Sequence, residues 1–316
     1  MSYNPFITGP MIKNSAYFVG RFRESVDILA KIHTNTSVSV VGEKRIGKSS
    51  LLYYLYNCCK TQFKDRRVAY LDFLNAEMKT LEGFVELLLA HLRIKYEDEA
   101  ALKADPNTFL TRRLRQLYHN NELPPIVFLD EFDKIEELPD FFNIVFLGNL
   151  RALCNEGHIC LVTASDKPLR EIMDRGSFAS HYSSIFTLIP LQEFVVETDL
   201  DERGQFLIHY WCGVLAPTVS EMRFLLSYTS THPLVMQIVS FNVCQNRYLS
   251  IKRSDNQLCE IIEQQIKSCF YDSRDDIRKW LYNTKIILPK NIKWEIEFIS
   301  KILKNLNPLK DLKIIG

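Results

Sequence analysis

The spacing of hydrophobic positions changes partway along the chain. In the first 190 or so residues, short apolar runs alternate with longer stretches whose apolar side chains recur every three to four positions. The longer stretches predict helices, and the short runs predict strands. The strands are expected at 37–42, 67–74, 124–130, 158–164 and 185–190, and the helices at 23–33, 48–59, 80–95, 107–119, 140–155 and 168–174. Strands that alternate with helices predict an α/β fold, with a parallel sheet and helices on both of its faces.

Beyond Pro190 the strand pattern stops, and only helical periodicity remains. These later helices are expected at 196–212, 219–229, 233–247, 255–271, 274–283 and 292–304. The change predicts four parts: an N-terminal segment (1–34), an α/β core (35–192), a helical lid (193–250) and a helical C-terminal region (251–316).

A glycine-rich loop lies between the first predicted strand and the next helix. Residues 42–49 read Gly-Glu-Lys-Arg-Ile-Gly-Lys-Ser, the G-x-x-x-x-G-K-S pattern of P-loop NTPases. Gly42 and Gly47 allow a tight backbone path, whose N–H groups can surround a phosphate at the helix N-terminus. Lys48 can reach the β- and γ-phosphates, and the Ser49 hydroxyl can bind Mg²⁺. The residues expected to bind ATP here are Gly42, Lys44, Arg45, Ile46, Gly47, Lys48, Ser49 and Ser50.

Two acidic residues follow the third predicted strand. Four apolar residues (126–129) predict a strand buried on both faces, and Asp130 and Glu131 come at its carboxyl end, where ligands collect in open α/β sheets. Asp130 can hold Mg²⁺, usually through water, and Glu131 can orient or deprotonate an attacking water. Alone the pair also fits an ordinary acidic turn, but the glycine loop favours a hydrolase site. Thr163, near the end of the fourth strand, is a candidate sensor of the γ-phosphate.

Composition narrows the class of protein. The 316 residues are 47% hydrophobic and 24% charged, which fits a soluble globular protein, and the net charge of +1 points to no partner. The eight cysteines show no C-x-x-C spacing, so no zinc site is predicted. With no secretory signal, this cysteine usage favours a reduced, cytoplasmic setting. No apolar run of about 18 residues exists, so no membrane span is expected.

The end of the chain is basic. From Arg278 onward there are nine Lys or Arg against three Asp or Glu, a net charge of +6. A solvated helix face explains this charge most simply, and a surface for nucleic acid or an acidic partner is the alternative. The apolar residues of the same stretch either pack on the lid or form a docking site for another chain.

Taken together, the chain resembles the NTPase module of bacterial STAND proteins, relatives of archaeal-type and origin-recognition-type ATPases. The resemblance covers about residues 1–250. Its motifs are, in order, Asn4-Pro5-Phe6 with Phe18-Val19-Gly20-Arg21-x-x-Glu24, Gly42 to Leu52, Leu129 to Ile135, Leu161 to Ser165 with Pro168-Leu169, and His232 to Gln237. It implies that the segment containing Arg21 packs on the nucleotide base and that Pro233 contacts adenine.

Two positions depart from that family's pattern. Asp166 stands where the family often has an arginine, and an acid near a γ-phosphate is repulsive. Either Asp166 faces away from the site, or hydrolysis is slow. The family also usually has a glycine two residues before the lid proline, and this chain has Ser230 and Thr231 there.

Three functions fit these features. The leading hypothesis is a regulatory ATPase whose nucleotide state moves the lid and controls self-association into a homo-oligomer or binding of an effector protein; the resemblance implies a role in defence or signalling. The alternative is a DNA-dependent ATPase of transposition-regulator or initiator-like type, which the basic end favours and the near-neutral total charge disfavours. The third is a scaffold that binds nucleotide without turnover, which Asp166 keeps open.

Overall fold

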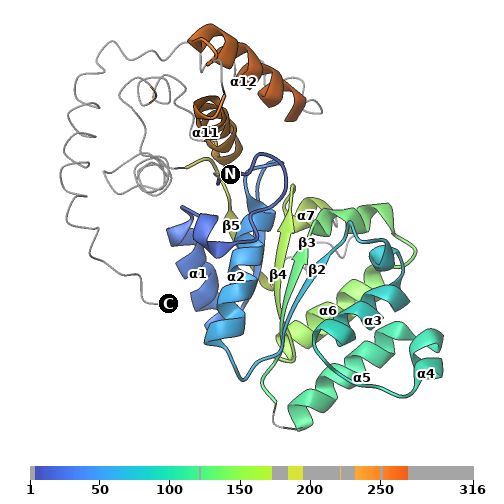
Figure 1. The fold of residues 1–316 in the computed structure, drawn as a ribbon. Helices are drawn as coiled ribbons and strands as arrows, with labels where there is room; N and C mark the ends of the chain where they lie inside the picture. Colours follow the sequence, from blue (N-terminus) through green and yellow to red (C-terminus); the bar gives the residue numbers. More distant parts are fainter. Residues whose placement is uncertain are drawn as a thin grey trace. The chain divides into compact units, whose positions relative to one another are not determined.

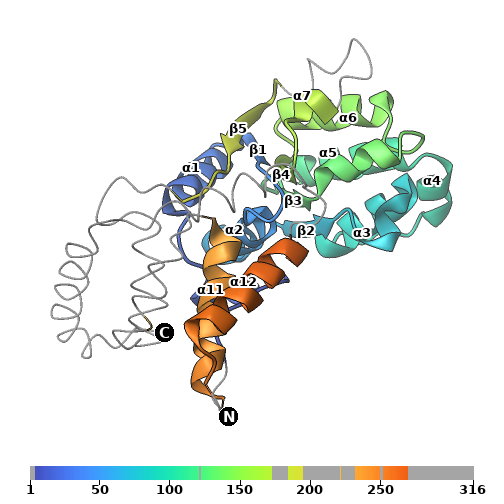
Figure 2. The same cartoon turned by 90° about the horizontal axis from the view of Figure 1, so that it is seen from above.

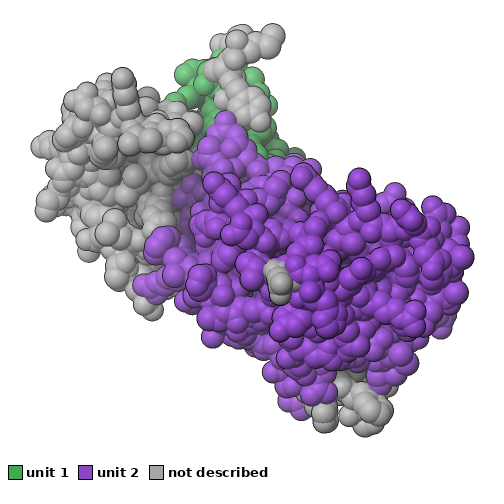
Figure 3. Space-filling view, turned by 90° about the horizontal axis from the view of Figure 1, so that it is seen from below, with its two compact units in different colours: residues 1–9, 195–316 green, residues 10–194 purple. Residues whose placement is uncertain are grey.

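A computed structural model describes residues 4–120, 122–172, 184–194, 221, 232–249 and 252–269 of the chain. The chain forms two compact units (Figure 3). Unit 2 is Pro10–Phe194, and unit 1 combines Met1–Gly9 with Val195–Gly316. The four-part division expected from the sequence stays a prediction.

Unit 2 contains a five-stranded parallel sheet. Its strands run in the order β2-β3-β4-β1-β5. They are β1 (Ser37–Val41), β2 (Val68–Asp72), β3 (Ile126–Asp130), β4 (Cys160–Ser165) and β5 (Phe186–Pro190). All five strands predicted from the apolar runs are present. The order places β4 at the centre, between β3 and β1, so the loops after these three strands meet at one edge of the sheet.

Helices cover both faces of this sheet (Figures 1 and 2). Helices α1 and α2 pack on one face, and α3, α5 and α6 cover the other. The helices are α1 (Phe22–His33), α2 (Lys48–Gln62), α3 (Leu81–His91), α4 (Glu99–Ala104), α5 (Pro106–His119), α6 (Ile144–Asn155) and α7 (Leu169–Ile172), with short 3-10 helices η1 (Ser15–Tyr17), η2 (Ala76–Lys79) and η3 (Phe132–Glu137). The six helices predicted for this unit are all present, and the sequence reading missed α4. The predicted α/β fold is confirmed.

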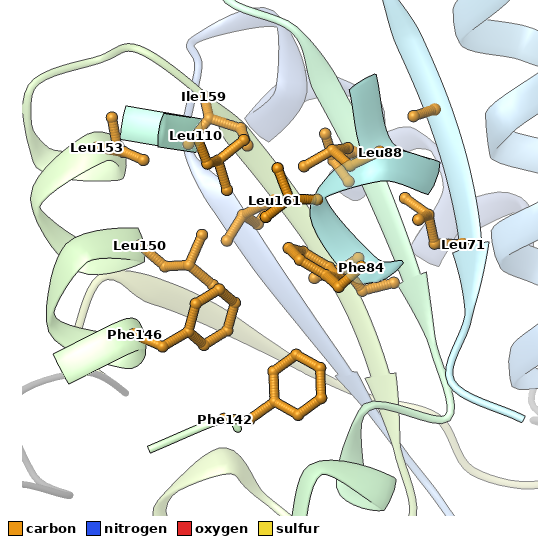
Figure 4. Close-up of a cluster of buried hydrophobic side chains, with 14 of the residues drawn as sticks. Leu71, Phe84, Leu88, Leu110, Phe142, Phe146, Leu150, Leu153, Ile159 and Leu161 are labelled. Carbon is orange, nitrogen blue, oxygen red and sulfur yellow. The ribbon is translucent and has the colours of Figure 1, made fainter. Parts of the chain in front are cut away.

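Each face of the sheet has its own hydrophobic core. Odd-numbered positions of β3 and β4, such as Leu129 and Leu161, join the core under α3, α5 and α6, where phenylalanine rings meet edge to face (Figure 4). Even-numbered positions, such as Phe128 and Val162, join the core under α1 and α2. This alternation follows from the two-residue period of a strand. It also decides which side of the sheet each polar side chain at the strand ends faces.

Unit 1 holds two described helices, α11 (Pro233–Arg247) and α12 (Asp255–Cys269), which pack against each other. The N-terminal residues of the chain belong to this unit because they bind α11. Asn4 Nδ2 donates to the carbonyl of Phe241 at 3.1 Å, and the Ile7 N–H donates to Gln237 Oε1 at 3.1 Å. The helices expected at 196–212, 219–229, 274–283 and 292–304, and the basic end of the chain, lie outside the described residues.

No helix within the described ranges is long and apolar enough to cross a membrane.

Candidate functional site

The loop after β1 has a backbone that only glycine allows at two positions. A Cβ on Gly42 would lie 2.5 Å from the carbonyl oxygen of Leu191, closer than such atoms can approach. Gly47 precedes α2 and has a φ of 101°, in the left-handed region that favours glycine. The loop therefore turns tightly from β1 into α2 and directs that helix's N-terminus toward the carboxyl edge of the sheet, a geometry suited to an anion.

Lys48 is the first residue of α2, and its side chain is only 6% exposed. Its ammonium donates to the carbonyls of Gly42 (2.9 Å) and Glu43 (3.0 Å) and to Asp166 Oδ1 (2.6 Å). These three acceptors match its three N–H donors. Asp166 follows β4, so it faces the loop instead of pointing away from it. The Asp166 carboxylate thus occupies one of the three donor positions of the lysine that is expected to bind phosphate.

Asp130 ends β3 and is 2% exposed, on the α2 side of the sheet. Its Oδ2 accepts from the Tyr70 hydroxyl at 2.7 Å, and the Ser49 hydroxyl lies near this carboxylate. Burial raises the pKa of Asp130, and the hydroxyls of Tyr70 and Ser49 oppose that shift. The two expected Mg²⁺ ligands, Ser49 and Asp130, thus lie together. A hydroxyl and a carboxylate suit Mg²⁺, which takes few protein ligands and completes its shell with water and phosphate.

Glu131 follows the strand in a left-handed conformation (φ 51°, ψ 42°) and directly precedes η3. Burial raises its pKa to about 7, the nearby Asp130 and Asp133 add to the shift, and Lys48 opposes it. A carboxylate with a pKa near the working pH is well matched to accepting a proton from water. The carboxyl edge of the sheet therefore gathers one buried cation and several acids.

Of the other predicted site residues, four lie in the loop or at the start of α2, and Pro233 lies in unit 1. Lys44 and Arg45 are exposed on the loop, and Ile46 is buried beneath it. The Ser50 hydroxyl accepts from the Ile12 N–H at 3.0 Å. Pro233 begins α11, in the other unit, so its expected contact with adenine stays a prediction.

Thr163 is fully buried, and its hydroxyl has no hydrogen-bond partner among the described residues. By strand alternation it lies on the face opposite Asp130, beside Leu129. Its expected role as a phosphate sensor stays a prediction. The side chain that β4 and its turn bring to Lys48 is that of Asp166.

Arg21 is buried inside unit 2, at 3% exposure. It donates to the carbonyl of Ile46 at 3.1 Å and to Glu24 Oε1 at 3.0 Å, and its guanidinium lies 4.7 Å from the centroid of the Phe194 ring. The expected packing of this segment on a base stays a prediction, but the structure adds a contact with the loop.

Tyr70 is a site residue that sequence reasoning missed. It lies on β2 two residues before Asp72, and its hydroxyl reaches Asp130 across the strand pair. Burial and the carboxylate of Asp130 both raise its pKa, so the hydroxyl stays protonated and donates. Strand alternation predicts the face of Tyr70, but only the pairing of β2 with β3 makes it a neighbour of Asp130.

No family model matches the chain, and no curated protein matches it in sequence. Solved structures do match. The Walker-type ATPase of Pyrococcus abyssi gives a TM-score of 0.55 at 15% identity, over 96% of this chain and 93% of that one. The ORC2 protein of Aeropyrum pernix, in ADPNP-ADP complexes, gives 0.52 at 13%, over 78% and 69%. The ORC1 protein of the same organism, in complex with DNA, gives 0.51 at 12%, over 95% and 80%.

The five-stranded parallel sheet with helices on both faces matches the fold of these solved structures. At these identities the likeness establishes the fold.

Proposed function

We propose that the chain is a slow, Mg²⁺-dependent ATPase that works as a regulatory switch of the STAND type. One observation carries the proposal: the buried Lys48 of a P-loop is held by an internal carboxylate, beside a Ser49–Asp130 pair and Glu131. This group combines a phosphate cation, two magnesium ligands and a base at the carboxyl edge of one sheet. The ADPNP-ADP complexes of the ORC2 protein support ATP as the nucleotide.

Each residue then has a role in binding or turnover. Lys48 and the N–H groups from Lys44 to Ser49 bind the phosphates. Ser49 and Asp130 hold Mg²⁺, which neutralises phosphate charge when bound. Glu131 accepts a proton from the attacking water. Turnover is slow because the ion pair between Asp166 and Lys48 must break when ATP binds. The negative charge of Asp166 then lies near the phosphates and repels them.

The switch function rests on the two-unit organisation and on the family resemblance. ATP bound by unit 2, with Pro233 of unit 1 on the base, would make the arrangement of the units depend on the nucleotide. Moving such an equilibrium from 1:99 to 99:1 needs roughly 5.5 kcal/mol of differential binding, a scale that phosphate, metal and base contacts can supply. The readout would be self-association or binding of an effector protein, in defence or signalling.

A DNA-dependent ATPase of initiator-like type is the second candidate. Two observations favour it: the net charge of +6 after Arg278, and the likeness of the fold to an ORC1 protein solved in complex with DNA. DNA that stimulates hydrolysis, with an effect that falls steeply as salt rises, would favour this candidate over the switch.

The direct test of the site is Lys48→Ala, measured by calorimetry with ATP. We expect ATP binding to weaken by about 100-fold or more, because the phosphates lose a buried cation. Lys44→Ala is the matched control, since Lys44 is an exposed lysine of the same loop that is expected to contribute its backbone. Unchanged affinity in Lys48→Ala would refute the site.

A further inference from the structure

The chain passes between the two units twice, at Gly9–Pro10 and at Phe194–Val195. Within unit 2, both crossing segments are fastened to the phosphate loop or to the start of α2. After the first crossing, the Ile12 N–H binds the Ser50 hydroxyl at 3.0 Å. Before the second, the Leu191 N–H binds the Val41 carbonyl, and the Leu191 carbonyl lies directly against Gly42. One connection to unit 1 therefore begins at the first turn of α2, and the other begins at the phosphate loop.

Arg21 joins the loop to the second crossing through a single side chain. Its Nη2 donates to the Ile46 carbonyl, and its guanidinium lies over the ring of Phe194, the last residue of unit 2. The other terminal nitrogen of the guanidinium, Nη1, donates to Glu24 Oε1 at 3.0 Å. The guanidinium is planar, so it can donate in its plane to a carbonyl while its face lies on an aromatic ring. A lysine ammonium has no such face.

The Ile46 carbonyl that Arg21 binds belongs to the Ile46–Gly47 peptide, whose N–H lies at the start of α2. In a trans peptide the C=O and the following N–H point in opposite directions, so the bond to Ile46 sets the direction of the Gly47 N–H. Gly47 is at the N-terminus of α2, where N–H groups face a bound phosphate. A turn of this peptide when phosphate binds would move the Ile46 carbonyl, and with it the guanidinium on Phe194.

We propose that Arg21 is a positioning residue that couples the phosphate loop to the segment leading into unit 1, holding the Ile46–Gly47 peptide and the Phe194 ring with one guanidinium. This inference rests on the proposed ATP-dependent switch. It differs from a role in binding the base, because the contacts of Arg21 with Ile46 and Phe194 lie inside unit 2.

The test compares Phe194→Leu and Arg21→Gln with the wild-type chain. ATP affinity is measured by calorimetry, and amide hydrogen exchange is followed over residues 42–50 and over α11, with and without saturating Mg·ATP. Phe194→Leu should bind ATP as the wild type does but lose the change in exchange that Mg·ATP causes in α11. Arg21→Gln should weaken ATP binding by about tenfold, because the loop peptide loses its orientation, and should also lose the α11 response.

Matched controls separate coupling from general damage. Phe22→Leu alters a phenylalanine that is 65% exposed, and Arg23→Gln alters an exposed arginine on the same helix, so both should behave as the wild type. Phe194→Tyr keeps a ring under the guanidinium and should restore the α11 response. If Arg21→Gln does not fold, the Phe194 pair alone decides the matter.

The outcomes distinguish the two claims. A wild-type chain that binds no ATP overturns the proposed function, and this inference with it. A wild-type chain that binds ATP and responds in α11, while Phe194→Leu responds equally, overturns the coupling alone. An unchanged ATP affinity in a folded Arg21→Gln would show that Arg21 does not position the loop.

Discussion

Two cationic side chains, the buried Lys48 and the partly buried Arg66, lie at opposite ends of the strands of the same parallel sheet. Lys48 lies at the carboxyl end and binds two loop carbonyls and Asp166. Arg66 precedes β2 at the amino end and donates to the carbonyls of Pro124 (2.6 Å) and Ile32 (2.9 Å) and to Asn35 Oδ1 (2.7 Å). Each cation thus has two backbone acceptors and one side-chain acceptor.

The difference lies in the third partner. For Arg66 it is a neutral amide, and the acceptors come from segments that precede β1 and β3, so the contact ties strand starts together. For Lys48 it is a carboxylate that lies near Glu131, and these two like charges repel each other. Arg66 stabilises the fold by binding the segments that precede β1 and β3. In the proposed site, a phosphate would replace the carboxylate partner of Lys48 when ATP binds.

The largest effect is expected at the carboxyl end, from Glu131→Gln. Phosphate release should fall by roughly 10² to 10⁴, the usual contribution of a general base, while Mg·ATP affinity is kept. The melting temperature should not fall, because the lost charge lies among other acids. Glu136→Gln, on the same η3 segment, is the control and should leave turnover unchanged. If Asp130→Asn gave the purely catalytic defect and Glu131→Gln lost the metal, the two roles are exchanged.

Arg66→Ala should act in the opposite way. It removes three hydrogen bonds at the strand starts, so the free energy of unfolding should drop by about 2–3 kcal/mol, measured by chemical denaturation. ATP affinity of the folded fraction should stay the same. Arg115→Ala is the control, because Arg115 forms a two-pronged pair with Glu156 on the surface and should contribute at most about 1 kcal/mol. A stable Arg66→Ala with weakened ATP binding would show that Arg66 serves the binding site and not the stability of the fold.

Asp166→Asn tests whether the partner of Lys48 is replaceable. The amide can still accept from Lys48 but no longer repels phosphate, so ATP without Mg²⁺ should bind about tenfold more tightly by calorimetry. Asp133→Asn removes a nearby charge that makes no contact with Lys48, and its effect should be smaller. Weaker binding in Asp166→Asn would show instead that the carboxylate holds Lys48 in its binding position.

The smallest effect is expected from Tyr70→Phe. The Asp130 carboxylate loses one of the bonds that orient it, so the Mg²⁺ concentration needed for half-maximal ATPase activity should rise by about threefold to tenfold. Tyr53→Phe, in the same aromatic cluster, is the control. Equal Mg²⁺ requirements in both variants would mean that the bond from Tyr70 is only structural.

The spacing of apolar and glycine residues was enough to predict the fold class and the local geometry of the loop. Five apolar runs became five strands, and the glycine pattern became a tight turn into α2, because both signals act between near neighbours in the chain. It also identified Asp130 and Glu131 as strand-end acids. Helix α4 was missed because six residues with an Asp cap give too short a periodicity to recognise.

Which polar side chains meet depends on how the whole chain packs. Asp166 reaches Lys48 across 118 positions, and Tyr70 reaches Asp130 across 60. The alternation of a strand tells which face a residue is on, but the order β2-β3-β4-β1-β5 and its register decide its neighbours. The sequence alone therefore predicts only that Asp166 faces away or slows hydrolysis, whereas the pairing of β4 with β1 places it at Lys48. The contacts of Arg21 with Phe194 and with the loop could not be predicted either, because such long-range contacts depend on how the whole chain packs.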